Sequence, residues 1–262
     1  MYKQLGVLIV HGIGIQEKGY SDPLQKSVDQ LIDKSGLIAN QVTFKEVLYV
    51  GVFDVQAKKR GSYLINTSHW VQLITRAIRW LLIFIFGDAI SYRAQYKAVH
   101  QKISVGLEEL QNKLPAETPI IIVAHSMGAI AISDYIYDLQ EDKFPELKLT
   151  KIANLKALIT LGCNIPLFQM GYTETLCIRR PESDTQNQDF YWQNFYSPFD
   201  ALGYRMAKYY TIRPSLQFPL LDSKVYAGNL LTKWNVFSHI GYWSNGKVQK
   251  HLARTIIKLL EN

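Results

Sequence analysis

Cysteine is scarce in this sequence, which holds only Cys163 and Cys177. Two thiols are too few for a disulfide scaffold, and neither has a nearby cysteine or histidine at zinc-ligand spacing. A disulfide-stapled domain and a zinc finger are therefore excluded. We expect both thiols to be reduced and to lie in or near the core, where unpaired cysteines usually lie.

Long hydrophobic runs are also missing. The uncharged stretch from Trp80 to Gly87 is much shorter than the roughly 20 residues of a membrane-spanning helix. The apolar run Gly6 to Val10 ends in a His-Gly-rich segment without a small-residue cleavage signal, so it is typical of a strand rather than a signal peptide. We therefore expect a cytoplasmic protein.

No Pro/Ser-rich tract, single-sign charge block or internal repeat divides the sequence. At 262 residues and 48% hydrophobic composition, the chain can bury a sizeable core. We predict one domain over residues 1–262.

The net charge of +7 favours an anionic partner. Nucleic acid is the weaker candidate, because the sequence has no run of five lysines or arginines, no zinc-finger spacing and no aromatic-basic RNA-binding motif. We predict no nucleic-acid partner and keep peripheral contact with an anionic membrane as the alternative.

Buried-strand patterns alternate with helical patterns along the chain, which predicts a mostly parallel sheet with helices on both faces. Ligands of such sheets bind at the carboxyl ends of the strands. Strands are expected at 6–10, 41–50, 119–126 and 155–162. Helices are expected from Ser21, as the cap, to Gly36, from Tyr92 to Leu114, directly after Ser126, and around Val248, Leu252, Ile256 and Leu259.

The segment Ala124-His125-Ser126-Met127-Gly128 joins a predicted strand directly to a predicted helix. A serine on such a sharp turn is the context of a nucleophile elbow, in which small residues two before and two after it allow close packing. A tight turn whose serine only caps the helix is the structural alternative.

A serine nucleophile needs a general base and an acid that orients it. His239 precedes the predicted last helix and is the candidate base, whereas His251 lies inside that helix and is read as an exposed surface histidine.

Asp200 follows an aromatic strand-like run and is the candidate acid. Asp222 is the second candidate acid, but it would stand at a strand's start and hence at the wrong edge of the sheet. Asp184 and Asp189 lie in a polar, loop-like stretch.

An oxyanion hole needs two backbone donors. We predict the N–H groups of Met127, directly after the serine, and of Ile13, between Gly12 and Gly14. His11 is expected to orient this loop.

Taken together, "VHG" after the first strand, "AHSMG" at the turn and "SHIGYW" near the end resemble the α/β-hydrolase superfamily, especially its lipase-like and esterase-like members. The resemblance spans residues 5–243, with alanine in place of the first glycine of G-x-S-x-G. It implies the α/β-hydrolase fold and cleavage of an apolar acyl ester through an acyl-enzyme, in which Ser126 attacks, His239 moves the proton and Asp200 holds the imidazole. It implies no metal or organic cofactor. A catalytically silent module that binds a membrane or a partner protein is the alternative.

Residues 51–91 do not fit a minimal hydrolase and are predicted to form a cap or lid insertion. The apolar run from Trp80 to Phe86, with Arg76 and Arg79 before it, suits either a helix packed over the site or core, or an interfacial helix that enters lipid.

Overall fold

The structure is a computed structural model of the 262-residue chain. It describes residues 2–12, 16–36, 39–49, 90–152, 154–171, 176–181, 190–210, 218–228 and 236–261. Within these ranges it contains a six-stranded sheet in which every neighbouring pair of strands is parallel. The strands are β1 (Leu5–Val10), β2 (Val42–Val47), β3 (Ile120–His125), β4 (Leu155–Leu161), β5 (Tyr191–Tyr196) and β6 (Leu220–Lys224).

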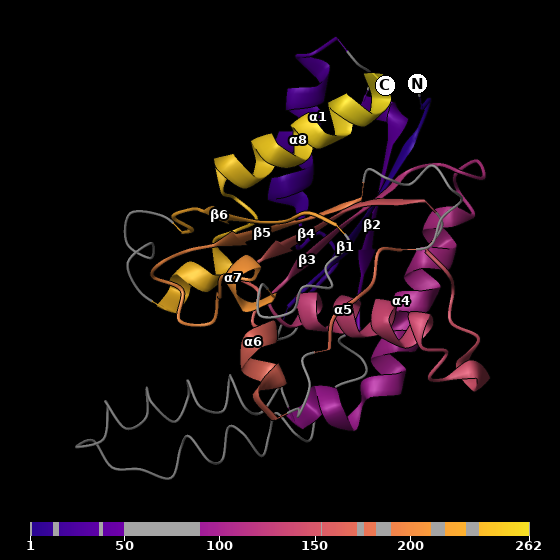
Figure 1. Cartoon of the computed structure of the whole chain (residues 1–262). Helices are drawn as coiled ribbons and strands as arrows, with labels where there is room; N and C mark the ends of the chain where they lie inside the picture. The colour runs from indigo at the N-terminus through magenta and orange to yellow at the C-terminus, as the bar shows by residue number, and fades with distance from the viewer. Residues whose placement is uncertain are drawn as a thin grey trace.

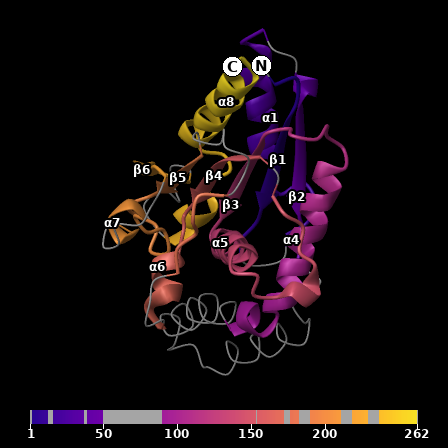
Figure 2. The ribbon, with the colours of Figure 1, turned by 45° about the vertical axis from the view of Figure 1, so that its right-hand side comes forward.

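Helices cover both faces of this sheet (Figures 1 and 2). α1 and α8 lie side by side on one face, and α4 and α5 lie on the other. The described helices are α1 (Asp22–Asp33), α4 (Tyr96–Gln111), α5 (Met127–Gln140), α6 (Ile165–Phe168), α7 (Ala207–Tyr210) and α8 (Gly246–Glu261), with 3₁₀ helices at Ala39–Gln41, Pro145–Leu147, Gln169–Gly171 and Val236–Ile240.

The central strands are apolar because both of their faces are covered. Every residue of β1, β3 and β4 is buried. Two apolar clusters result, one on each side of the sheet. This is the pattern expected of parallel strands, whose residues cannot alternate between core and water.

The strand order is β2-β1-β3-β4-β5-β6. From β1 the chain moves outward to β2 and then returns to the other side of β1 to form β3. The direction of winding therefore reverses between β1 and β3. In open parallel sheets, the crevice at the carboxyl ends of the strands beside such a reversal is where ligands bind.

The helix predicted from Tyr92 to Leu114 is shorter in the structure. Residues 90–94 are helical, Gln95 lies in a turn, and α4 follows. The tyrosines on either side of this turn are tied to carboxylates one turn apart on α5: the Tyr92 hydroxyl donates to Asp134 at 2.8 Å and the Tyr96 hydroxyl to Asp138 at 2.6 Å. The spacing of apolar residues does not reveal the turn at Gln95, because the apolar face of the helix continues through it.

Of the predicted insertion at 51–91, only Ile90 and Ser91 are described, so the run from Trp80 to Phe86 and the cations Arg76 and Arg79 lie outside the described residues. Among the helices that the structure does describe, none is long and apolar enough to cross a membrane.

Candidate active site

Ser126 alone connects β3 to α5, since β3 ends at His125 and α5 begins at Met127. Its φ of 55° and ψ of −123° are costly for a residue with a side chain, by about 1–3 kcal/mol. Two backbone hydrogen bonds hold this conformation. The Ser126 N–H donates to the Leu161 carbonyl at 2.9 Å, and the Ser126 carbonyl accepts from the Ala129 N–H at 2.9 Å. Such strain is typical of functional sites, where the surrounding structure maintains it.

Glycines let the neighbouring segments approach this turn closely. A Cβ atom on Gly128 would lie 2.4 Å from the His11 carbonyl oxygen and 2.6 Å from that of Val10. A Cβ atom on Gly12 would lie 2.7 Å from the Ser126 Cβ. The end of β1 is therefore packed directly against the serine and the first turn of α5.

His239 lies in the 3₁₀ helix Val236–Ile240, just before α8, and its ring joins two other side chains. Its Nε2 lies 2.7 Å from the Ser126 Oγ. Its Nδ1 lies 2.9 Å from each of the two carboxylate oxygens of Asp200. An ionised carboxylate can only accept, so Nδ1 carries the hydrogen and Nε2 is left to accept the serine proton.

Asp200 follows β5 in a turn, and three groups donate to its carboxylate. Besides His239, these are the Leu202 N–H at 2.9 Å and the Tyr242 hydroxyl at 2.8 Å. Burial alone would raise the pKa of Asp200, but the hydrogen bond and charge of His239, together with the bonds from Tyr242 and Leu202, lower that pKa below its usual value. Asp200 is therefore ionised at neutral pH, and its oxygens can accept the Nδ1–H hydrogen of His239.

Tyr242 is a neighbour of this series that the sequence analysis did not single out. Its hydroxyl accepts a hydrogen bond from the Ser197 N–H at 2.9 Å while it donates to Asp200. It thereby fixes the acid relative to the end of β5. Its position in the sequence could have indicated this role, because Tyr242 lies three residues after His239 in "SHIGYW", a segment that carries part of the family resemblance.

His125 is a second such neighbour. Its Nε2 lies 2.7 Å from the backbone carbonyl of His239, and a carbonyl can only accept, so this nitrogen carries a hydrogen. Burial, followed by the charge of His239, lowers the pKa of His125 to about 3, so the ring is neutral at pH 7. It ties the residue before the serine to the backbone of the histidine segment.

The structure corrects the placement of Asp222. This residue lies in the middle of β6 rather than at its start. Its carboxylate accepts from Asn194 at 2.8 Å and from the N–H groups of Met206 at 2.9 Å and Ala207 at 3.0 Å. It therefore holds the segment that leads into α7 and makes no contact with His239. Asp184 and Asp189 lie outside the described residues.

His251 is also placed differently from the prediction, because it is half-buried rather than exposed. Its ring packs edge-on against Phe195, with 5.2 Å between ring centroids, and more distantly against Tyr191. It is separate from the group around Ser126.

Ser126 and His239 open into a cavity of about 240 Å³. His11 lines this cavity, stacks on Tyr49 at 4.0 Å between ring centroids, and has its Nδ1 2.6 Å from the Gly12 carbonyl oxygen. Burial lowers the pKa of His11 to about 4 despite that hydrogen bond. The described residues that line the cavity are His11, Gly12, Gln16, His125, Ser126, His239, Ile240 and Trp243.

Of the two predicted oxyanion donors, only Met127 can be placed. Its N–H belongs to the first turn of α5, where an amide has no acceptor within the helix, and it directly follows the serine. Ile13 lies outside the described residues. Within the described ranges, no group of three or more His, Cys, Asp or Glu side chains is arranged to hold a metal ion.

Several solved structures are similar to this chain, at low identity. One is esterase B from Lactobacillus rhamnosis, with a TM-score of 0.49 and 9% identity over 99% of this chain and 77% of the other. A second is Est1E from Butyrivibrio proteoclasticus, with a TM-score of 0.44 and 10% identity over 100% and 90%. A third is dienelactone hydrolase from Anabaena variabilis, with a TM-score of 0.42 and 11% identity over 97% and 84%.

No protein-family model matches the sequence, and comparison with curated proteins gives no match. The fold is therefore read from the architecture itself. A parallel sheet is covered on both faces, its winding reverses between β1 and β3, and a strained serine joins β3 to the helix that follows. The chain has the α/β-hydrolase fold that its motifs predicted.

Proposed function

We propose that this chain is a serine hydrolase that cleaves carboxylic esters through an acyl-enzyme intermediate. The observation that carries the proposal is the hydrogen-bonded series from Ser126 through His239 to Asp200, at 2.7 Å and 2.9 Å. A serine hydroxyl is a weak nucleophile at neutral pH, and a base within hydrogen-bond reach that is itself oriented by an acid is what activates it.

In the first half of the reaction, Ser126 Oγ bonds to the ester carbonyl carbon as its proton passes to His239 Nε2. Asp200 stabilises the imidazolium that forms and stays ionised. The negative charge on the former carbonyl oxygen is met by the Met127 N–H, with Ile13 N–H as the proposed second donor. His239 then returns the proton to the leaving alkoxide as the carbon–oxygen bond breaks.

The second half repeats these steps with water. His239 takes a proton from the attacking water, the tetrahedral intermediate collapses, and Ser126 leaves with that proton while the carboxylic acid departs. The series needs no further group to balance the reaction. The same chemistry serves thioesters and amides, and esters are proposed because the motifs around Ser126 and His239 resemble those of esterase-like and lipase-like hydrolases.

An uncharged acyl group suits the cavity best. Its described lining includes no Lys, Arg, Asp or Glu side chain, and the lowered pKa values of His11 and His125 make both rings neutral at pH 7. Ile240 and Trp243 add apolar surface at its edge. A charged acyl group would lose hydration there without gaining a partner.

The test is hydrolysis of a panel of p-nitrophenyl esters from acetate to palmitate by the wild-type chain, Ser126→Ala and the exposed-serine control Ser35→Ala. We expect the wild type and the control to hydrolyse at least one ester. Ser126→Ala should lose activity by several orders of magnitude, on the order of the 10⁶-fold seen when a serine nucleophile is removed elsewhere. If the folded wild type hydrolyses none of the esters, a silent binding module is the better account.

A further inference from the structure

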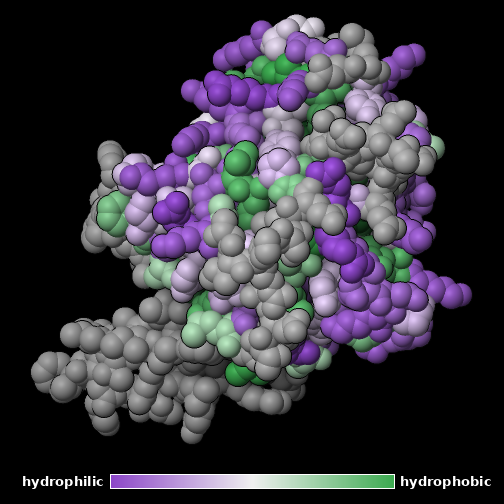
Figure 3. Space-filling view, in the orientation of Figure 1, coloured by the Kyte–Doolittle hydropathy of each residue, from purple (hydrophilic) through white to green (hydrophobic). Residues whose placement is uncertain are grey.

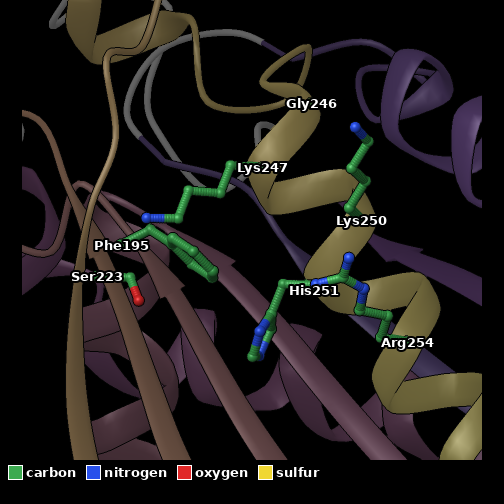
Figure 4. Close-up of a pocket in the computed structure, with 7 residues that line it drawn as sticks. All are labelled: Phe195, Ser223, Gly246, Lys247, Lys250, His251 and Arg254. Carbon is green, nitrogen blue, oxygen red and sulfur yellow. The ribbon is translucent and has the colours of Figure 1, made fainter.

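A second cavity, of about 290 Å³, lies between α8 and the last two strands (Figure 4). The strand side is formed by Phe195 of β5 and Ser223 of β6, each one residue before the end of its strand. Of the described residues, none lines both this cavity and the one at Ser126. Its volume is close to the lower end of the roughly 300–1,000 Å³ typical of ligand pockets, so it suits a small ligand.

Positive charge dominates the lining. Lys247, Lys250 and Arg254 contribute to it from α8, and the described lining includes no Asp or Glu side chain. Figure 4 shows Lys247 reaching across toward the strands and the guanidinium of Arg254 bending back toward His251, whereas Lys250 extends away from the strands. In the view of Figure 3, hydrophilic side chains cover most of the outer face of α8.

Asp222, the acidic residue next to Ser223 in the sequence, does not neutralise this charge. Asp222 precedes Ser223 in β6, and successive side chains of a strand point to opposite faces of the sheet. The Asp222 carboxylate is engaged by Asn194, Met206 and Ala207 on the face away from α8.

None of these cations has an acidic partner in the part of the chain that the structure describes. Neither Lys250 nor Arg254 forms an ion pair within the described part of the chain. The Lys247 ammonium donates to the Lys224 carbonyl at 2.9 Å, which fixes it at the strand side and leaves its other two hydrogens free to donate elsewhere. Lys247 and Arg254 carry like charges on one hollow and have no acidic partner among the described residues, so an anion between them would relieve their repulsion.

His251 adds a neutral polar group to the same hollow. Its Nε2 atom is buried and has no hydrogen-bond partner among the described residues. Burial, and then the charges of Arg254 and Lys247, lower the pKa of His251, so its imidazole is neutral at pH 7 and can present an N–H to an oxyanion. Buried polar atoms rarely stay unsatisfied, and a bound ligand is one way to satisfy them.

We propose that this cavity binds a phosphate group, held by Lys247 and Arg254 on its two sides and by the His251 ring below. Two sources carry this chemistry: a free phosphate or phosphomonoester, and the phosphate of an anionic lipid headgroup. The site is independent of ester cleavage at Ser126, and a hydrolytically inactive chain would still contain it.

The test is calorimetric titration of inorganic phosphate into the folded chain at pH 7 and constant chloride, with NMR observation of the histidine ring resonances. We expect phosphate to bind and to shift the His251 resonances while those of His239 stay in place. Lys247→Gln/Arg254→Gln should weaken binding about tenfold or more, because the variant loses two cations that donate charge-assisted hydrogen bonds to the phosphate. Both side chains are exposed, so the variant should fold.

A matched variant controls for general charge. Lys34→Gln/Lys258→Gln removes the same two charges from exposed positions that do not line the cavity, and it should bind phosphate as the wild type does. No phosphate binding by the wild type, no shift at His251, or equal weakening in both double variants would overturn the proposal.

Vesicles then distinguish the sources. If phosphatidic acid vesicles compete with inorganic phosphate and phosphatidylcholine vesicles do not, the ligand is a lipid phosphate. If neither competes while inorganic phosphate still binds, the ligand is a soluble phosphate.

Discussion

At the scale of single residues, the two candidate acids differ in what their oxygens contact. Asp200 faces the His239 ring at 2.9 Å, whereas Asp222 accepts from Asn194 and from backbone N–H groups at the start of α7 and pairs with Arg205 at 3.9 Å. Both are buried carboxylates with several donors, so either can be structural. Only Asp200 is placed to set the tautomer of a histidine that also contacts a serine.

We therefore predict that Asp200→Asn lowers kcat by roughly 10⁴-fold, the loss seen when a triad aspartate is neutralised elsewhere. Asp222→Asn should leave kcat within about tenfold of the wild type and act mainly on stability, because it disturbs the backbone ahead of α7. Steady-state kinetics on the best ester, with circular dichroism of each variant, measures both effects. The reverse order of losses would mean that Asp200 is not the acid.

The residues whose chemistry follows from motif order could be predicted from the sequence, and the structure brings Ser126, His239 and Asp200 together. The contacts that neighbouring side chains make with these three residues could not be predicted. His125 reaches the His239 carbonyl across more than a hundred residues of chain, and no local pattern encodes that bond. His251 was misplaced because helical spacing alone did not reveal that its ring packs against Phe195 of β5.

At the scale of elements, the junction of β3 and α5 depends on the absence of a side chain at Gly128. The atoms that an added Cβ would meet are the carbonyl oxygens of Val10 and His11, which belong to the central strand β1 and the residue after it and so cannot move cheaply. Position 128 therefore fixes how closely the first turn of α5 approaches β1.

We predict that Gly128→Ala lowers the free energy of unfolding by about 1–3 kcal/mol, as overpacking of a core does, and lowers kcat by shifting the Met127 N–H. Gly246→Ala is the matched control, since nothing lies within 4 Å of a Cβ built there and alanine favours a helix. Urea denaturation of the two variants makes the comparison. Equal stability would show that the junction adjusts to the methyl group.

Element types were predicted better than element ends. Strands β1, β3 and β4 follow directly from their apolar runs, but the cap of α1 does not follow from Ser21. This serine stands at the predicted position, yet its hydroxyl donates to the Glu46 carboxylate at 2.6 Å and accepts no hydrogen bond from a helix N–H. Glu46 also accepts from the N–H groups of Gly19 and Ser21, so a tertiary contact with β2 replaces the local cap.

At the scale of the whole molecule, the burial of His11 and His125 in the neutral form makes stability depend on pH. Burial is the main reason that the pKa values of His11 and His125 fall to about 4 and about 3. In an unfolded chain both would titrate near 6.5. Below about pH 6.5 the unfolded chain thus binds protons that the folded chain does not. The free energy of unfolding therefore decreases as the pH is lowered, by up to about 1.4 kcal/mol per pH unit for each histidine.

We predict that the wild type loses stability steadily between pH 6.5 and about 4, and that His125→Gln has a shallower loss over this range. The variant should be the less stable protein at pH 7.5, because the bond to the His239 carbonyl is altered, and the two curves should converge as the pH falls. Urea denaturation at pH 7.5, 6, 5 and 4 provides the measurement. Parallel curves would show that His125 is not buried in the neutral form.

The central claim is that the fold activates one serine. The most direct measurement is labelling with a fluorophosphonate probe, with the modified residue identified by mass spectrometry of the digested protein. The account predicts one adduct per chain, on Ser126, which is absent in Ser126→Ala and strongly slowed in His239→Ala. An adduct on another serine, or undiminished labelling of Ser126→Ala, would contradict it.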